Sequence, residues 1–167
     1  MDALEAIFTR RSIRRYRPEP VPMDLVNQLL AAGMSAPSAM NIRPWQFIVI
    51  TERKIMDEIP KFHPYSAMLR SAPLVLCVCG DITASEKYWV LDCSAAAENI
   101  LIAARALGLG AVWLAVYPVE SRIMNLKELL RLPENIVPLC LIAVGYPAEE
   151  KPRSAGRDEA RVHYNEW

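Results

Sequence analysis

The chain has 167 residues, of which 53% are hydrophobic and 23% are charged, and this composition suits one soluble globular domain with a sizeable core. Nineteen basic and nineteen acidic residues give a formal net charge of zero, which argues against nucleic acid as the main partner. The apolar runs are too short to cross a bilayer, and the N-terminus lacks the basic and apolar regions of a signal peptide. We therefore expect a cytoplasmic protein with no membrane or nucleic-acid partner.

The chain begins with an amphipathic pattern over residues 2–10, in which apolar residues recur at the spacing of a helix. A basic stretch, residues 9–14, follows where this helix should end. Within it Arg10, Ser12 and Arg14 alternate, so an extended backbone would point their side chains to one side. Because an arginine fork binds phosphate oxygens bidentately, these residues form a candidate phosphate site. The alternative is a solvated basic turn whose cations favour the C-terminus of the preceding helix.

A second helix is expected over residues 24–33, with Gly33 as its terminator. The loop that follows, residues 35–45, contains two prolines and several small residues, which argue against regular structure. Small residues let a backbone approach a flat ligand closely, and Ser38 and Asn41 can hydrogen-bond the edge of a ring. The loop is therefore either a ligand-binding segment or a well-packed structural loop, and the residues favour neither reading.

Apolar runs rich in β-branched residues predict four strands, at residues 45–50, 74–79, 111–116 and 139–144. Further helices are predicted at residues 52–59, 88–107 and 121–130, with a short helix inside 60–72. The helix 88–107 is apolar nearly all round, so we expect it to be central and buried, with a partner for Glu98. Gly108 and Gly110 follow this helix and precede a strand, which is the reverse of the order in a dinucleotide-binding loop, so no Rossmann site is encoded.

The four cysteines and two histidines do not indicate metal or nucleophilic chemistry. Cys77 and Cys79 alternate within an apolar strand, which favours two buried side chains over a redox or metal role. His63 and His163 are far apart in the chain and match no zinc spacing. The chain also shows no Ser/His/Asp or Cys/His set, so we expect neither a metal site nor a catalytic side chain.

The C-terminal segment, residues 148–167, is mostly charged but ends with Val162, Tyr164 and Trp167. A disordered tail does not usually end with such residues, and aromatic side chains are enriched in the cores of interfaces. We therefore expect a single domain, 1–167, whose tail is an arm that docks on a partner subunit. The alternative is an arm that folds back on its own subunit.

Together, and in this order, the motifs resemble those of the FMN-dependent nitroreductases in their short-chain form. The resemblance covers nearly the whole chain and rests on residues 10–14, 35–41 with 44–45, 108–113, and 145–147 with 162–164. It implies an α+β fold with a mixed, mainly antiparallel sheet flanked by helices, assembled as an intertwined homodimer. It also implies one FMN per subunit at the dimer interface, with NAD(P)H as the electron donor.

The resemblance assigns three groups of residues to the FMN. The ribityl phosphate would be held by the basic stretch, through Arg10, Ser12 and Arg14 with Arg11 nearby, and by one of Lys151, Arg153 and Arg157, of which Arg153 is favoured. The isoalloxazine ring would be contacted, partly from the other subunit, by Pro37, Ser38, Ala39, Met40 and Asn41. The opposite side of the ring would be lined by Trp113, Leu114 and Ala115.

The function implied is reduction of nitroaromatic, quinone or related acceptors by a ping-pong mechanism in which the flavin N5 carries the hydride. Two positions depart from the family pattern: Arg43 stands where many relatives carry Gln, and Ala115 stands where Gly is frequent. The alternatives are a specialised relative, such as a reductive dehalogenase or a flavin-fragmenting enzyme, and a non-catalytic flavin-binding protein for storage or sensing. Those specialised relatives usually carry a lid, and residues 51–73 leave little spare length for one.

Overall fold

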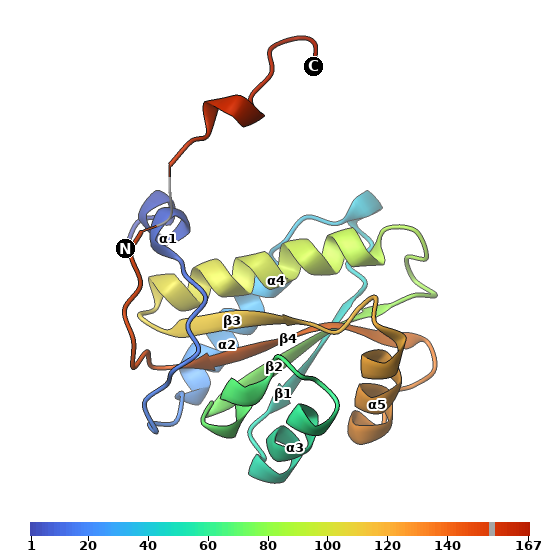
Figure 1. Ribbon diagram of the computed structural model, residues 1–167. Coiled ribbons are helices and arrows are strands. Elements are labelled where there is room, and N and C mark those ends of the chain that lie inside the picture. Colours follow the sequence, from blue (N-terminus) through green and yellow to red (C-terminus); the bar gives the residue numbers. More distant parts are fainter. Residues whose placement is uncertain (154–155) are drawn as a thin grey trace.

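The computed structural model describes residues 1–153 and 156–167 and shows an α+β fold built on one four-stranded sheet (Figure 1). The strands are β1 (Trp45–Ile50), β2 (Leu74–Asp81), β3 (Gly110–Ala115) and β4 (Ile136–Gly145). The α-helices are α1 (Ala3–Thr9), α2 (Met23–Met34), α3 (Arg53–Glu58), α4 (Trp89–Ala106) and α5 (Glu120–Leu130). The short 3-10 helices are η1 (Ala39–Asn41), η2 (Ile59–Lys61), η3 (Ala67–Arg70) and η4 (Glu159–Arg161). Among the described residues, no helix combines the length and hydropathy that a membrane span requires.

The strands lie in the order β1-β2-β4-β3, and every neighbouring pair is antiparallel. The expected α+β fold with a mainly antiparallel sheet is confirmed, and the parallel pairing in the described residues is one isolated bridge between Ser12 and Ala111. Because β3 pairs with β4 on its other side, this bridge lays the basic stretch, residues 9–14, along the free edge of β3. The fold therefore brings the N-terminal basic residues to the sheet.

The central strand β2 is buried on both faces, which explains its continuous apolar run. Leu74, Leu76 and Val78 face the core formed with α2 and α4. The alternating residues Val75 and Cys77 face a second core formed with α3 and α5. Figure 1 shows these two helix layers on opposite faces of the sheet. The four cysteines are free and buried, as two of them were expected to be.

Gly33 does not end α2 but lies inside it, contrary to the expectation from the sequence. A Cβ atom at this position would lie 3.0 Å from the side chain of Ile100, so the absence of a side chain lets α2 and α4 pack closely. The helix ends one residue later, and the N–H of Ser35 is bonded to the carbonyls of its last turn. The glycine is thus a packing residue.

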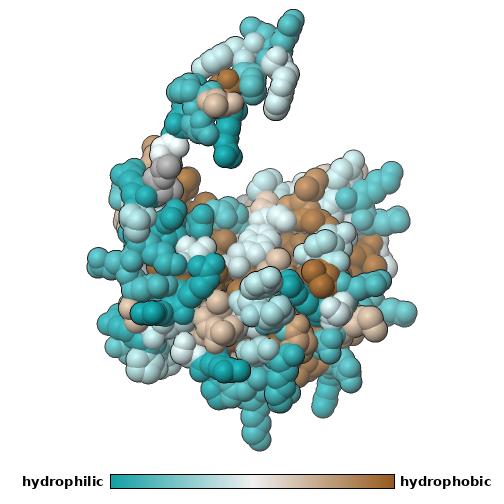
Figure 2. Space-filling view, viewed as in Figure 1, coloured by the Kyte–Doolittle hydropathy of each residue, from teal (hydrophilic) through white to brown (hydrophobic). Residues whose placement is uncertain are grey.

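The helix α4 is less completely buried than its composition suggests. Leu91 is 66% exposed, and Glu98, two turns further on, is also exposed and pairs with Arg10 at 3.3 Å. On α1, Leu4 and Phe8 are exposed as well. Figure 2 shows apolar surface gathered over the N-terminal half of α4. A single copy of the chain therefore leaves apolar surface uncovered.

In Figure 1 residues 156–167 extend away from the sheet and its helices. The contacts of their aromatic side chains are local: the rings of His163 and Trp167 stack at 4.4 Å, and Arg157 donates a hydrogen bond to the hydroxyl of Tyr164 at 2.8 Å. Tyr164 and Trp167 are strongly exposed. Residues 156–167 thus do not fold back on their own subunit in this structure, and their docking on a partner stays a prediction.

Candidate functional site

A pocket of about 380 Å³ lies between the end of α1, the C-terminal end of α4 and the segment that follows β4. We call it the basic pocket, because five of the side chains that line it are cationic: Arg10, Arg11, Arg105, Lys151 and Arg153. Two acidic side chains, Glu149 and Glu150, also line it. The excess of positive charge suits an anionic ligand, and guanidinium groups suit a phosphate in particular.

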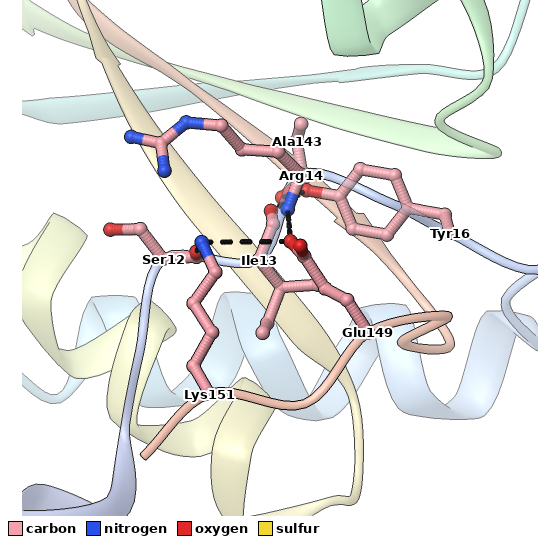
Figure 3. A network of polar contacts seen from close by, with 7 residues as sticks. All are labelled: Ser12, Ile13, Arg14, Tyr16, Ala143, Glu149 and Lys151. Atoms are coloured by element: carbon pink, nitrogen blue, oxygen red, sulfur yellow. Dashed lines mark hydrogen bonds and ion pairs between the residues drawn. The ribbon is translucent and has the colours of Figure 1, made fainter. Parts of the chain in front are cut away.

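The basic stretch is fixed against the sheet by a backbone hydrogen bond to β3 and by the hydroxyl of Tyr16, which Figure 3 shows beside Ile13 and Ala143. The N–H of Ile13 donates to the carbonyl of Ala111 on β3 at 3.0 Å. The hydroxyl of Tyr16 lies 2.6 Å from the carbonyl oxygen of Ile13 and 3.2 Å from that of Ala143 on β4. Burial raises the pKa of Tyr16, so this hydroxyl stays protonated and remains a donor. The backbone that carries the basic side chains is therefore rigidly placed.

The segment after β4 clamps the same stretch from the other side (Figure 3). Oε1 of Glu149 accepts a hydrogen bond from the N–H of Arg14 at 2.6 Å. The ammonium of Lys151 donates to the carbonyl of Ser12 and lies 3.6 Å from Glu149. The backbone N–H of Arg14, and secondarily Lys151, lower the pKa of Glu149. Lys151 thus lines the basic pocket while its ammonium anchors the backbone.

The other cations of the basic pocket differ in their partners. Arg10 pairs with Glu98 on α4 at 3.3 Å, and Arg153 lies 3.9 Å from Glu5 on α1. Nε of Arg11, in contrast, is buried and has no hydrogen-bond partner among the described residues. A buried donor without an acceptor is costly, so this atom indicates that a ligand oxygen belongs in the pocket.

Arg105 also lines the basic pocket, although it was not expected from the sequence. It lies near the C-terminal end of α4, and its Nε donates to Oγ1 of Thr9 at 2.9 Å. The signal was present in the sequence, because Arg105 is the one cation in the apolar run of α4 and lies seven residues after the exposed Glu98. Residues seven apart share a helix face, so both charges point toward the basic stretch.

A second pocket, of about 400 Å³, lies at the C-terminal end of β3. We call it the β3 pocket, and its lining residues are Arg14, His63, Pro64, Tyr65, Ala67, Met68, Trp113, Leu114, Ala115 and Arg122. The carbonyl of Ala115 lies 3.0 Å from Nε2 of His63 and accepts a hydrogen bond from Arg122 at 2.9 Å. His63 and Arg122 were not expected from the sequence, which offers no spacing that would join them.

The protonation of His63 follows from these contacts. A carbonyl oxygen only accepts, so Nε2 carries the hydrogen when the ring is neutral. Nδ1 is then an acceptor, and it is buried without a partner among the described residues. Burial lowers the pKa of His63, and the nearby Arg122 lowers it further. The folded protein therefore favours the neutral form of this imidazole.

The loop with residues 35–45 contains a run of strained backbone. Met40, Asn41 and Arg43 have φ angles of 51°, 57° and 57°, a region that residues with side chains rarely adopt. Its neighbours hold it in place: Oδ1 of Asp92 accepts from the N–H of Ala39 at 2.9 Å, and Oγ of Ser38 accepts from the N–H of Arg43 at 2.9 Å. Strain of this kind concentrates at functional sites, so the loop is a candidate ligand contact.

The fold thus divides the residues expected at the site into three groups. The basic pocket receives Arg10, Arg11, Lys151 and Arg153. The β3 pocket receives Arg14, Trp113, Leu114 and Ala115. Neither pocket is lined by the remaining ones, Ser12, Pro37, Ser38, Ala39, Met40, Asn41 and Arg157. The loop residues were expected partly from a second subunit, and Arg157 bonds within the tail instead.

The sequence model of the nitroreductase family matches residues 7–63 and 60–146, and the chain belongs to this family. The resemblance recognised in the sequence is therefore confirmed. A protein of Methanothermobacter thermautotrophicus, provisionally named NADH dehydrogenase/NAD(P)H nitroreductase, is 47% identical over 170 residues. That match covers 100% of this chain and 88% of the relative.

Solved structures agree with the family assignment. The FMN-dependent nitroreductase of Clostridium difficile superposes with a TM-score of 0.92 at 28% identity, covering 98% of this chain and 99% of that one. A provisionally named nitroreductase of Desulfovibrio desulfuricans, solved in complex with FMN, gives a TM-score of 0.84 at 32% identity. The latter match covers 100% of this chain and 98% of the other.

Proposed function

We propose that this chain is an FMN-dependent NAD(P)H oxidoreductase that reduces nitroaromatic, quinone or related acceptors. The observation that carries the proposal is the basic pocket, with its buried unpaired donor on Arg11, next to the pocket at the end of β3. The names of the relatives, NAD(P)H nitroreductase and FMN-dependent nitroreductase, support the same activity.

The residues present fit an FMN molecule. The dianionic phosphate would be held in the basic pocket, where Arg10, Arg11 and Arg153 offer guanidinium donors. The ring would use the β3 pocket, in which Trp113 and Ala115 form part of the wall. The strained loop would reach a ring from the facing subunit.

When bound, the flavin would supply the redox chemistry, a ping-pong transfer in which N5 carries a hydride from NAD(P)H to the acceptor. A nitro group that receives one hydride and one proton becomes a nitroso group and releases water. The chain contributes binding, orientation and exclusion of water. No side chain needs to act as nucleophile or metal ligand, so the proposal requires none of the buried cysteines.

We also propose that the active form is a homodimer. Leu4, Ile7 and Phe8 on α1 and Leu91 on α4 are large apolar side chains that a single copy leaves exposed. Exposed apolar surface of this kind usually marks an interface. A dimer would cover it and would bring the strained loop of one copy to the pockets of the other.

The test begins with the purified protein, which should be yellow and should release FMN rather than FAD on denaturation. Anaerobic addition of NADH or NADPH should bleach the flavin band within the mixing time of a stopped-flow instrument, and 4-nitrobenzamide or a quinone should then restore it. FAD as the sole pigment would contradict the cofactor assignment. A flavin that stays oxidised with both nicotinamides would favour a storage or sensing protein over an enzyme.

A further inference from the structure

The β3 pocket has an unbalanced positive charge, of which the proposed flavin site uses only a part. Two guanidinium groups, those of Arg14 and Arg122, line it, and none of its lining residues is acidic. Among the described residues, no carboxylate pairs with either guanidinium. Every arginine that lines a pocket carries its charge at any ordinary pH, so this field is permanent.

Arg122 is held in place before any ligand arrives. One of its terminal nitrogens donates to the carbonyl of Ala115 at 2.9 Å, and its guanidinium lies 5.6 Å from the centre of the Tyr65 ring. These two contacts restrain the guanidinium group and use only one of its N–H donors in a hydrogen bond. A preorganised fork loses little freedom on binding, which favours a carboxylate as its partner.

Two aromatic residues, Tyr65 and Trp113, form part of the walls of the same pocket. Tyr65 is 72% exposed, and Trp113 lines the pocket from β3. Such faces stack on planar rings, whereas a small spherical anion would gain nothing from them. The pocket thus joins one oriented cation to aromatic surface.

Resting on the proposed function, we propose that the β3 pocket selects planar aromatic acceptors that carry a carboxylate, and that Arg122 is the residue that binds this carboxylate. Arg14, which comes from the basic stretch, remains with the flavin, whereas Arg122 comes from α5 and is free for the acceptor. The chain therefore discriminates among acceptors by charge, at a position outside the cofactor-binding stretch.

The binding test uses titration calorimetry to measure the affinity of oxidised holoenzyme for three non-reducible probes, benzoate, benzamide and acetate. Benzoate should bind about tenfold or more tightly than benzamide, the size of effect expected for a charge-assisted hydrogen bond, and acetate should bind more weakly than benzoate. Added salt should weaken the binding of benzoate and leave the binding of benzamide unchanged. In Arg122→Gln the benzoate preference should fall to near one, and in Arg122→Lys it should be partly restored.

The matched control is Lys54→Gln, which removes one positive charge from an exposed position on α3 outside both pockets. It should keep the full benzoate preference. With 4-nitrobenzoate and 4-nitrobenzamide as acceptors, Arg122→Gln should raise the KM ratio of the charged to the neutral compound about tenfold.

Equal binding of benzoate and benzamide by the wild-type holoenzyme would overturn the proposal, as would an undiminished preference in Arg122→Gln. The Ala115 carbonyl keeps its contact with His63 in this variant, so folding should survive. If it does not, Arg122→Lys and the salt series still decide the question. Failure of both nitro compounds to oxidise the reduced flavin would instead contradict the proposed activity, and benzoate binding would remain a separate result.

Discussion

The basic pocket and the β3 pocket both contain guanidinium groups, but their charges are balanced differently. In the basic pocket Arg10 faces Glu98, and Arg153 faces Glu5, so carboxylates of α4 and α1 orient the cations. In the β3 pocket a neutral carbonyl and an aromatic ring orient Arg122 instead. Counter-charges organise a site and also weaken its net field. The first pocket is therefore suited to hold the phosphate of a permanent ligand, whereas Arg122 in the second is suited to choose among ligands that come and go.

The largest expected effect comes from removing residues 160–167, the end of the arm that starts beside the basic pocket. Tyr164 and Trp167 are exposed on a single copy, so on a partner they would bury large aromatic area. The truncated protein should dissociate to monomers and, because binding is linked to assembly, should lose FMN from both pockets. Analytical ultracentrifugation that records the flavin band measures the two losses together.

A truncated protein that stays dimeric and retains its flavin would remove the arm from the interface. A full-length protein that sediments as a monomer with FMN bound would contradict the shared site itself. Either result would leave the comparison between the pockets intact, because both pockets are lined by one chain.

The next largest effect distinguishes the contribution of the basic pocket to FMN affinity from the contribution of the tail. Arg11→Met should keep the aliphatic packing of the side chain and remove the buried donor, so FMN should bind about 1.5–3 kcal/mol more weakly. Arg157→Met is the matched control, because Arg157 bonds to Tyr164 and Glu159 and lines neither pocket. Titration of apoprotein with FMN, followed by flavin fluorescence, gives both affinities. A larger loss of FMN affinity in Arg157→Met than in Arg11→Met would instead indicate that the tail holds the phosphate.

The fold could be predicted well from the sequence because its signals are local. The four strands and the long helices are apolar runs or periodic patterns bounded by Gly and Pro, and they lie where the patterns place them. The role of Gly33 could not be predicted in this way. Its importance depends on Ile100, sixty-seven positions away, and close packing between helices leaves no mark on either segment alone.

The site was predictable where a motif carries it and unpredictable where the fold assembles it. Arg10 and Arg11 belong to one compact stretch, and the structure places both in the basic pocket. His63 and Arg122 come close together only because the fold brings two separate segments to the carbonyl of Ala115, which contacts both side chains. Such a meeting is a property of tertiary structure, since neither residue has a partner at a characteristic spacing in the sequence.

A smaller effect concerns Glu149, which holds the backbone between the two pockets. Its pKa lies below the ordinary value of 4.5, chiefly through the N–H of Arg14, so its stabilisation is complete above that value and is lost as the pH falls through the lowered pKa. Glu149→Gln should lose less than about 1 kcal/mol at neutral pH, because the side chain keeps contact with solvent. The variant should also lack the loss of stability that protonation of Glu149 causes in the wild type at acid pH. Urea unfolding over a pH series measures both, and an unchanged acid limb would contradict the assignment.

The smallest effect tests whether the charge of the β3 pocket comes from its arginines alone or also from the imidazole of His63. The pKa of His63 is lowered from its ordinary value of 6.5 by burial and by Arg122, so the unfolded chain takes up a proton before the native one does. The free energy of unfolding should therefore fall as the pH drops below 6.5, until the native imidazole also titrates. His63→Gln keeps a donor for the Ala115 carbonyl but does not titrate, so it should remove this dependence while leaving that of Glu149. His163→Gln is the control, because His163 lies in the arm outside both pockets, and it should leave the profile unchanged. If His63→Gln and the wild type gave parallel profiles between neutral pH and the acid limb of Glu149, the pKa of His63 would be the same in the folded and unfolded chain, and the contrast with the basic pocket would be weaker than the structure indicates.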